Sequence, residues 1–170
     1  MSMPPLKLLM ILRHAEALPS DSGGDAARKL SGKGLQDAAA LGLLMREKKW
    51  LPQRVYCSTT IRTRQTLEQV SAGLGALPTD FEERIYSGGL PDMMDLIRAT
   101  PPDIHRLLIV GHNPGIHALA VSLAAEGASP LLNQMTMGYA PGSLSVLECP
   151  LHDWRMLAPH QNSLVDFVTA

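Results

Sequence analysis

The sequence has few of the features that mark secreted, membrane or metal-binding proteins. It contains only two cysteines, Cys57 and Cys149, which lie far apart and match no metal-binding spacing. Two cysteines cannot form the disulfide framework of a small secreted domain, so a reduced, cytoplasmic protein is expected. No apolar run approaches the ~20 residues needed to cross a membrane. The apolar run over 6–12 is too short for a signal peptide.

The sequence also lacks a surplus of charge of either sign. Its formal net charge is −1, whereas proteins that bind duplex nucleic acid usually carry a basic face. We therefore expect neither nucleic acid nor a membrane as a partner. The chain shows no internal repeat, low-complexity tract or linker, and 45% of its residues are hydrophobic. This composition predicts one globular domain over residues 1–170.

Strand-like and helix-like segments alternate along the chain. The predicted strands are apolar or alternating runs over 6–12, 54–57, 77–81, 106–110, 142–148 and 154–157. The runs over 6–12 and 106–110 are apolar apart from Lys7 and Arg106. Such runs are typical of strands buried on both faces. This order of elements favours an α/β fold, a three-layer sandwich with a mostly parallel central sheet and helices on both faces.

The predicted helices share apolar residues at three- and four-residue spacing. They cover 32–51, 59–73, 90–99 and 114–125. Ser31, Ser58 and Asn113 are the expected N-caps, because their side chains can accept hydrogen bonds from the first free backbone N–H groups. Pro52 is expected to end the first helix. The apolar tail over 164–168 does not clearly predict either a helix or a strand.

Arginine and histidine side chains follow three of the predicted strands. Arg13 and His14 end the first strand, and Arg62 lies in the first turn of the helix after the second. His112 follows the strand over 106–110. In open α/β sheets, ligands bind just beyond the carboxyl ends of the strands. We therefore expect these two arginines and two histidines to converge on one edge of the sheet.

Such a set of side chains suits a phosphoryl group. Guanidinium groups bind phosphate oxygens through paired, charge-assisted hydrogen bonds. One histidine can be neutral and attack phosphorus, while the other is protonated and stabilises charge. Ser58 and Asn113 are expected to support substrate binding by orienting helix N-termini toward the anion. The sequence contains no P-loop and no metal-binding motif, so neither a metal nor a cofactor is expected.

Three segments resemble the motifs of the histidine phosphatase superfamily, which includes the phosphoglycerate mutases. Residues 12–16 are similar to its Arg-His-Gly opening, 58–66 to its Ser-x-x-x-Arg-x-x-Gln-Thr segment and 110–115 to its second-histidine segment. Residues 25–34 match a further family segment less closely. The short chain and its Gly-His-Asn-Pro-Gly sequence look most like the SixA-type phosphohistidine phosphatases.

The resemblance implies a phosphoglycerate mutase-like α/β sandwich that works without a metal. It also implies that His14 becomes transiently phosphorylated and that Arg13, Arg62 and His112 bind the phosphoryl group. The expected reaction is a two-step displacement: neutral His14 attacks phosphorus in line, and water then hydrolyses the phosphohistidine.

The chain departs from the family pattern at the general acid. Acid phosphatases of the family carry an acidic residue after the second histidine, where this chain has Asn113. Mutases carry a glutamate in an insertion that is short here, and Glu82 and Glu83 match no family motif. An imidazole leaves phosphorus more readily than an alkoxide, so a site without a dedicated acid suits P–N cleavage better than P–O cleavage. Glu16 and Glu82 are candidates for activating the water.

The predicted substrate is therefore a phosphohistidine on a protein, such as a histidine phosphotransfer domain, which would connect this chain to signal transduction. Two other functions remain open. The chain could be a phosphatase or mutase for small phosphate esters, with Glu82 or Glu83 as the acid. It could also be a phosphate- or phosphoprotein-binding module without turnover, although the presence of both arginines and both histidines argues against this.

Overall fold

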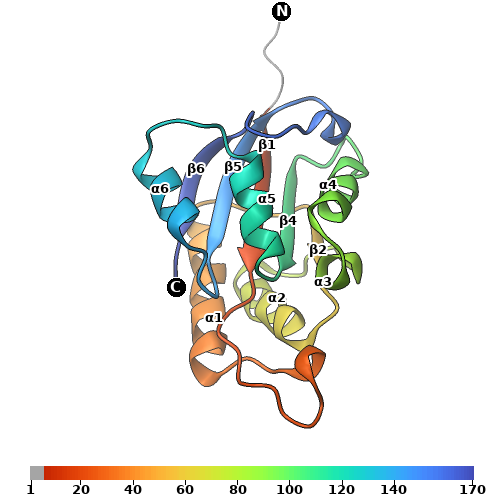
Figure 1. The fold of residues 1–170 in the computed structure, drawn as a ribbon, viewed down its shortest axis with the longest axis vertical. Coiled ribbons are helices and arrows are strands. Elements are labelled where there is room, and N and C mark those ends of the chain that lie inside the picture. Colours follow the sequence, from red (N-terminus) through yellow and green to blue (C-terminus); the bar gives the residue numbers. More distant parts are fainter. Residues whose placement is uncertain (1–5) are drawn as a thin grey trace, which may run out of the picture.

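A six-stranded sheet forms the centre of the computed structural model, which describes residues 6–170 (Figure 1). The strands are β1 (Leu6–Arg13), β2 (Arg54–Cys57), β3 (Thr79–Phe81), β4 (Arg106–Gly111), β5 (Leu144–Pro150) and β6 (Ser163–Val168). Their order is β3-β2-β4-β1-β5-β6. Strands β3, β2, β4 and β1 are parallel, whereas β5 runs antiparallel to both β1 and β6.

Helices cover both faces of the sheet, as predicted for an α/β sandwich (Figure 1). The helices are α1 (Gly32–Glu47), α2 (Ile61–Leu74), α3 (Arg84–Ser87), α4 (Leu90–Arg98), α5 (Gly115–Leu123) and α6 (Pro130–Met137), with short 3-10 helices η1 (Asp25–Ala27) and η2 (Trp154–Met156). Helices α1 and α2 pack on one face, and α3 to α6 on the other. No helix within residues 6–170 is long and apolar enough to span a membrane.

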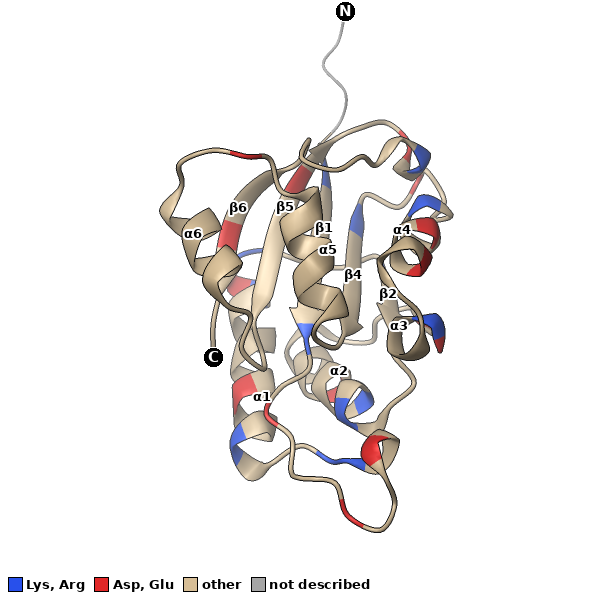
Figure 2. Cartoon of the chain, viewed as in Figure 1, with Lys and Arg blue, Asp and Glu red and all other residues tan. Residues whose placement is uncertain are grey.

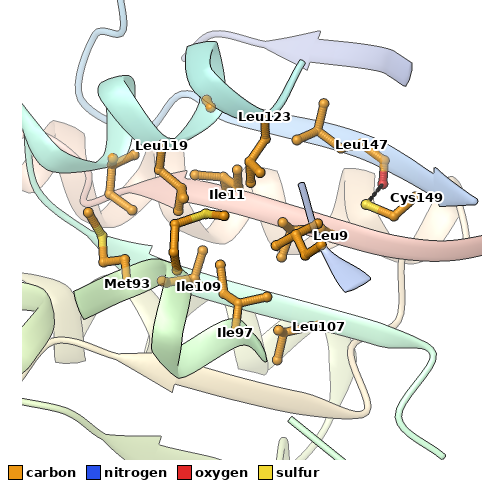
Figure 3. Close-up of a cluster of buried hydrophobic side chains, with 14 of the residues drawn as sticks. Leu9, Ile11, Met93, Ile97, Leu107, Ile109, Leu119, Leu123, Leu147 and Cys149 are labelled. Carbon is orange, nitrogen blue, oxygen red and sulfur yellow. Dashed lines mark hydrogen bonds between the residues drawn. The ribbon is translucent and has the colours of Figure 1, made fainter. Parts of the chain in front are cut away.

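Strand β1 lies at the centre because its side chains are apolar on both faces. Leu9 and Ile11 belong to one hydrophobic cluster and Met10 and Leu12 to the other, and all four are fully buried. Figure 3 shows the first cluster, in which side chains of β1 and β4 meet those of α4 and α5. Burying apolar surface on both faces fixes the strand and therefore the position of the residues at its carboxyl end.

The structure differs from the predicted elements at several places. The segment 154–157 is not a strand, and that prediction is wrong: Trp154 is buried and its indole N–H donates to the carbonyl of Ile104 at 2.7 Å, which holds η2 as a tight turn. Helix α1 ends at Glu47, ahead of Pro52, because Lys49 adopts a positive φ of 59°. The tail forms β6.

Helices α1 and α2 approach each other closely through glycines. A Cβ atom at Gly42 would lie 2.4 Å from the backbone oxygen of Val70, so only glycine fits at this position. Because α2 carries Arg62 on its first turn, this contact also sets the position of one predicted site residue.

We predict that Gly42→Ala lowers the free energy of unfolding by about 1–3 kcal/mol, because the new methyl group forces two packed backbones apart. Urea denaturation measures the change. Gly32→Ala is the matched control, since a Cβ at this helix-start glycine meets nothing within 4 Å. Equal stability of the two variants would contradict the prediction.

Candidate active site

The carboxyl ends of β1, β2 and β4 meet at one edge of the sheet, and the predicted site residues lie there. Arg13 pairs in register with Gly111, so His14 and His112 follow neighbouring strands directly. The two imidazole ring centroids are 5.4 Å apart. Figure 2 shows basic residues at the tip of β1 and on α2, next to the acidic η1 segment.

His14 is held as a neutral imidazole with one defined lone pair. Its Nδ1 lies 2.7 Å from the carbonyl oxygen of Ala15, and because an oxygen of this kind only accepts, Nδ1 carries the hydrogen. Burial, assisted by the nearby charges of Arg62 and Arg13, lowers the pKa of His14 to about 4. At neutral pH the lone pair of Nε2 is therefore free to act as a nucleophile.

His112 is also neutral, which differs from the imidazolium expected from the sequence. Burial, followed by the charge of Arg62, lowers the pKa of His112 to about 3. Its Nε2 lies 2.7 Å from the hydroxyl of Ser58. The hydroxyl of Ser58 makes no other hydrogen bond within residues 6–170, so we assign Ser58 as the donor and Nε2 as the acceptor. The hydrogen of His112 is then on Nδ1, where it can be given to an anion.

The backbone carbonyl of Tyr139 holds the side chain of Arg13 in place. Its Nη1 donates to the carbonyl of Tyr139 at 2.9 Å, and the side-chain amide of Asn113 donates to the same oxygen at 2.9 Å. The buried hydroxyl of Tyr139 donates to the carbonyl of Ile11 at 2.6 Å. Tyr139 thus links Arg13 and Asn113 to β1. The sequence carried no signal for this role, because the contact spans distant parts of the chain.

Arg62 is held by Asp25 across the site. Its Nη2 donates to the carboxylate of Asp25 at 3.0 Å and its Nη1 to the backbone oxygen of Asp25 at 2.8 Å. The hydroxyl of Tyr86 donates to the same carboxylate at 2.9 Å. This bond, together with Arg62 and Arg28, lowers the pKa of Asp25 to about 2, so the carboxylate stays charged. Asp25 lies in the weakly matching segment 25–34, whereas Tyr86 was not identified from the sequence.

Ser58 and Asn113 do not cap helices, so that expectation is wrong. Thr60 stands at the N-cap of α2 and Pro114 at that of α5. The freed side chains bond His112 and the carbonyl of Tyr139 instead. Both side chains therefore contact other residues of the site directly. The N-cap predicted at Ser31 is confirmed, since its hydroxyl accepts from the backbone N–H of Gly34.

Buried polar atoms that lack a partner among residues 6–170 gather at this site. They include Nε of Arg13, Nε of Arg62, Nδ1 of His112 and Oδ1 of Asn113. Buried polar groups are nearly always hydrogen-bonded in folded proteins. Three of these atoms are N–H donors, so the arrangement fits an anion with several acceptor oxygens, such as a phosphoryl group.

The carboxylates considered as acids or bases lie outside this cluster. Glu16 accepts from the hydroxyl of Ser31 at 2.8 Å, Glu82 accepts from Arg84 at 3.2 Å, and Glu83 accepts from the hydroxyl of Thr59. Across residues 6–170, no carboxylate bonds His14 or His112, and no group of three His, Cys, Asp or Glu side chains is arranged to hold a metal ion.

Comparisons with known proteins connect this geometry to one family. Residues 9–87 match the model of the histidine phosphatase superfamily (branch 1). An uncharacterized protein of Mycobacterium leprae is 31% identical over 123 residues, which cover 69% of this chain and 74% of that protein.

Two solved structures share the fold. A protein of Nakamurella multipartitia assigned as phosphohistidine phosphatase SixA is 27% identical, with a TM-score of 0.87, over 99% of this chain and 98% of that one. A protein of Agrobacterium tumefaciens with the same assignment is 23% identical, with a TM-score of 0.78, over 96% and 99% of the two chains.

We predict that Ser58→Ala lowers turnover about tenfold, because losing the hydroxyl removes the hydrogen bond that fixes the tautomer of His112. Steady-state kinetics on a phosphorylated substrate measure the loss. Thr59→Ala is the matched control, since the neighbouring hydroxyl bonds Glu83 rather than an imidazole. An equal loss of activity in both variants would contradict this role of the Ser58 hydroxyl.

We also predict that neither His14 nor His112 takes up a proton between pH 8 and pH 5, because their pKa values lie at about 4 and about 3. Ring NMR resonances report the charge directly.

The same pKa values make stability depend on pH. An unfolded histidine titrates near pH 6.5, so unfolding binds protons below that value. The free energy of unfolding is therefore expected to fall as the pH drops from about 6.5 toward 4. Titration of either ring near pH 6.5 would contradict this.

Proposed function

The chain belongs to the histidine phosphatase superfamily, in its SixA-type group, and is a phosphatase; we propose that it removes the phosphoryl group from phosphohistidine on a protein. A histidine phosphotransfer domain is the kind of partner that we propose, which would give the chain a role in signal transduction. The observation that supports this most is the buried, neutral His14, whose Nε2 is free beside two arginines while no carboxylate within residues 6–170 bonds either imidazole.

In the first proposed step, the lone pair on Nε2 of His14 attacks phosphorus in line. A new N–P bond forms, and the bond between phosphorus and the substrate imidazole breaks. The electron pair of the broken bond stays on the substrate nitrogen, which takes a proton from solvent. Arg13, Arg62 and Nδ1–H of His112 donate to the phosphoryl oxygens and stabilise the charge that develops there.

In the second proposed step, water attacks the phosphorus of phospho-His14. The N–P bond breaks with its electron pair returning to Nε2 of His14, and a proton of the attacking water passes to solvent. Inorganic phosphate leaves, and His14 returns to its neutral form. The same three donors can stabilise both transition states, because the phosphoryl group stays in one place while its partners change. The proposal assigns no side chain as the base, since Glu16 and Glu82 bond other residues.

The missing acid supports P–N cleavage over P–O cleavage. An alkoxide leaving group needs a proton from a positioned acid, whose help is typically worth about 10²–10⁴-fold in rate. Glu83 and Glu82 engage Thr59 and Arg84 rather than the imidazoles. We further propose that the reaction needs no metal ion, because two guanidinium groups and an imidazole N–H already supply the donors that a phosphoryl group requires.

We predict that a protein phosphorylated on histidine transfers its label to His14. The measurement is rapid mixing, an alkaline quench and mass spectrometry of the digested chain. In the wild type, label is expected to appear on His14 and to disappear from the donor. With His14→Ala, the chain is expected to stay unlabelled and the donor to keep its label. EDTA is expected to leave the rate unchanged.

Glu82→Gln and Glu83→Gln serve as controls, because they remove the carboxylates that an ester phosphatase would need. Both variants are expected to keep full activity on the phosphohistidine protein. If the wild type leaves the donor labelled but hydrolyses small phosphate esters, and either variant abolishes that hydrolysis, the proposal is wrong.

A further inference from the structure

A pocket of about 260 Å³ lies beside His112, between the α3–α4 connection and the start of α5. Its walls include Tyr86, Gly89, Leu90 and Ala118, together with His112 itself. The pocket is smaller than the ~300–1,000 Å³ typical of drug-sized ligands, so it suits a single ring rather than a large molecule. None of the mechanistic steps above uses it.

The chemistry of the walls is neutral and largely apolar. No Asp, Glu, Lys or Arg lines the pocket, judged over residues 6–170. The ring of Tyr86 faces that of His112 with centroids 5.4 Å apart and planes tilted by 59°, a common arrangement of aromatic neighbours. A neutral planar ring can pack against such walls, whereas an anionic group would lose its hydration without finding a counter-charge.

The pocket is continuous with the proposed phosphoryl site. It shares His112 and Asn113, and both residues also belong to the cluster of unpartnered polar atoms. The leaving group stays bonded to phosphorus until the transition state, so it must occupy space next to the phosphoryl oxygens. A second pocket, of about 240 Å³ between α1 and the C-terminal residues, contains none of the site residues.

We infer that the pocket beside His112 is the leaving-group subsite and that it receives the imidazole ring of the substrate phosphohistidine. This inference rests on the proposed function and adds a reason for substrate choice. Contact with the ring during bond cleavage favours a neutral heteroaromatic leaving group, and the uncharged walls disfavour the anionic leaving groups of sugar-acid phosphates.

Filling the pocket from either side tests the subsite. Ala118→Trp extends an exposed side chain of α5 into it, and Gly89→Leu does so from the opposite wall. Gly89 tolerates a side chain, because its φ of −114° is ordinary and a Cβ there would contact only Pro91, at 3.6 Å. Ala40→Trp is the matched control, since Ala40 is an exposed helical alanine that lines the second pocket.

Two quantities are measured for each variant: kcat/KM for a histidine phosphotransfer protein phosphorylated on histidine, and the inhibition constant of orthovanadate, which probes the phosphoryl site alone. Both pocket variants are expected to lose about 10- to 100-fold in kcat/KM. Their vanadate constants are expected to stay within about twofold of the wild type, and Ala40→Trp to leave both quantities unchanged.

Unchanged kcat/KM in both pocket variants would overturn the inference, and so would a parallel loss of vanadate binding, which would indicate a distorted phosphoryl site. A wild type that binds vanadate but does not dephosphorylate the protein would instead refute the proposed function. The two failures are therefore distinguishable, because one appears in the variants and the other in the wild type.

Discussion

One hydrogen bond, between Nδ1 of His14 and the carbonyl of Ala15, determines what the rest of the site can do. It assigns the hydrogen to Nδ1 and leaves Nε2 as the only nitrogen with a free lone pair. Burial then keeps the ring uncharged although two arginines lie nearby. Strand β1, in which the side chains of residues 9–12 are fully buried, ends one residue earlier. The hydrophobic core therefore indirectly fixes the direction in which the nucleophile points.

Of the two arginines beside His14, only Arg62 is paired with a carboxylate within residues 6–170. Asp25 is the carboxylate that bonds Arg62, and it reaches the site from the loop between β1 and α1. Arg13 is held by a backbone carbonyl instead, which positions the guanidinium without neutralising it. The site therefore keeps a positive potential where an anion would bind, even though the whole chain has a net charge of −1.

Much of this arrangement follows from the sequence, and the exceptions have physical reasons. Apolar runs and the rule for strand ends were enough to predict the central strands and the edge where Arg13 and His112 meet. The N-cap of α2 was misplaced because Ser58, Thr59 and Thr60 are consecutive hydroxyl residues and each is a good cap. The neutral state of His112 depends on burial, and the contact between Arg13 and Tyr139 joins distant residues, so neither could be predicted from local patterns.

The sheet order also gives the molecule two unlike ends. Strand β6 runs parallel to β1, and Leu12, Leu144 and Val168 lie side by side across three strands. The last described residues therefore emerge at the edge that carries the histidines, whereas β1 begins at the opposite edge (Figure 1). A fusion partner or surface anchor attached before β1 would leave the approach of a protein substrate open. The same attachment after β6 would stand in its path.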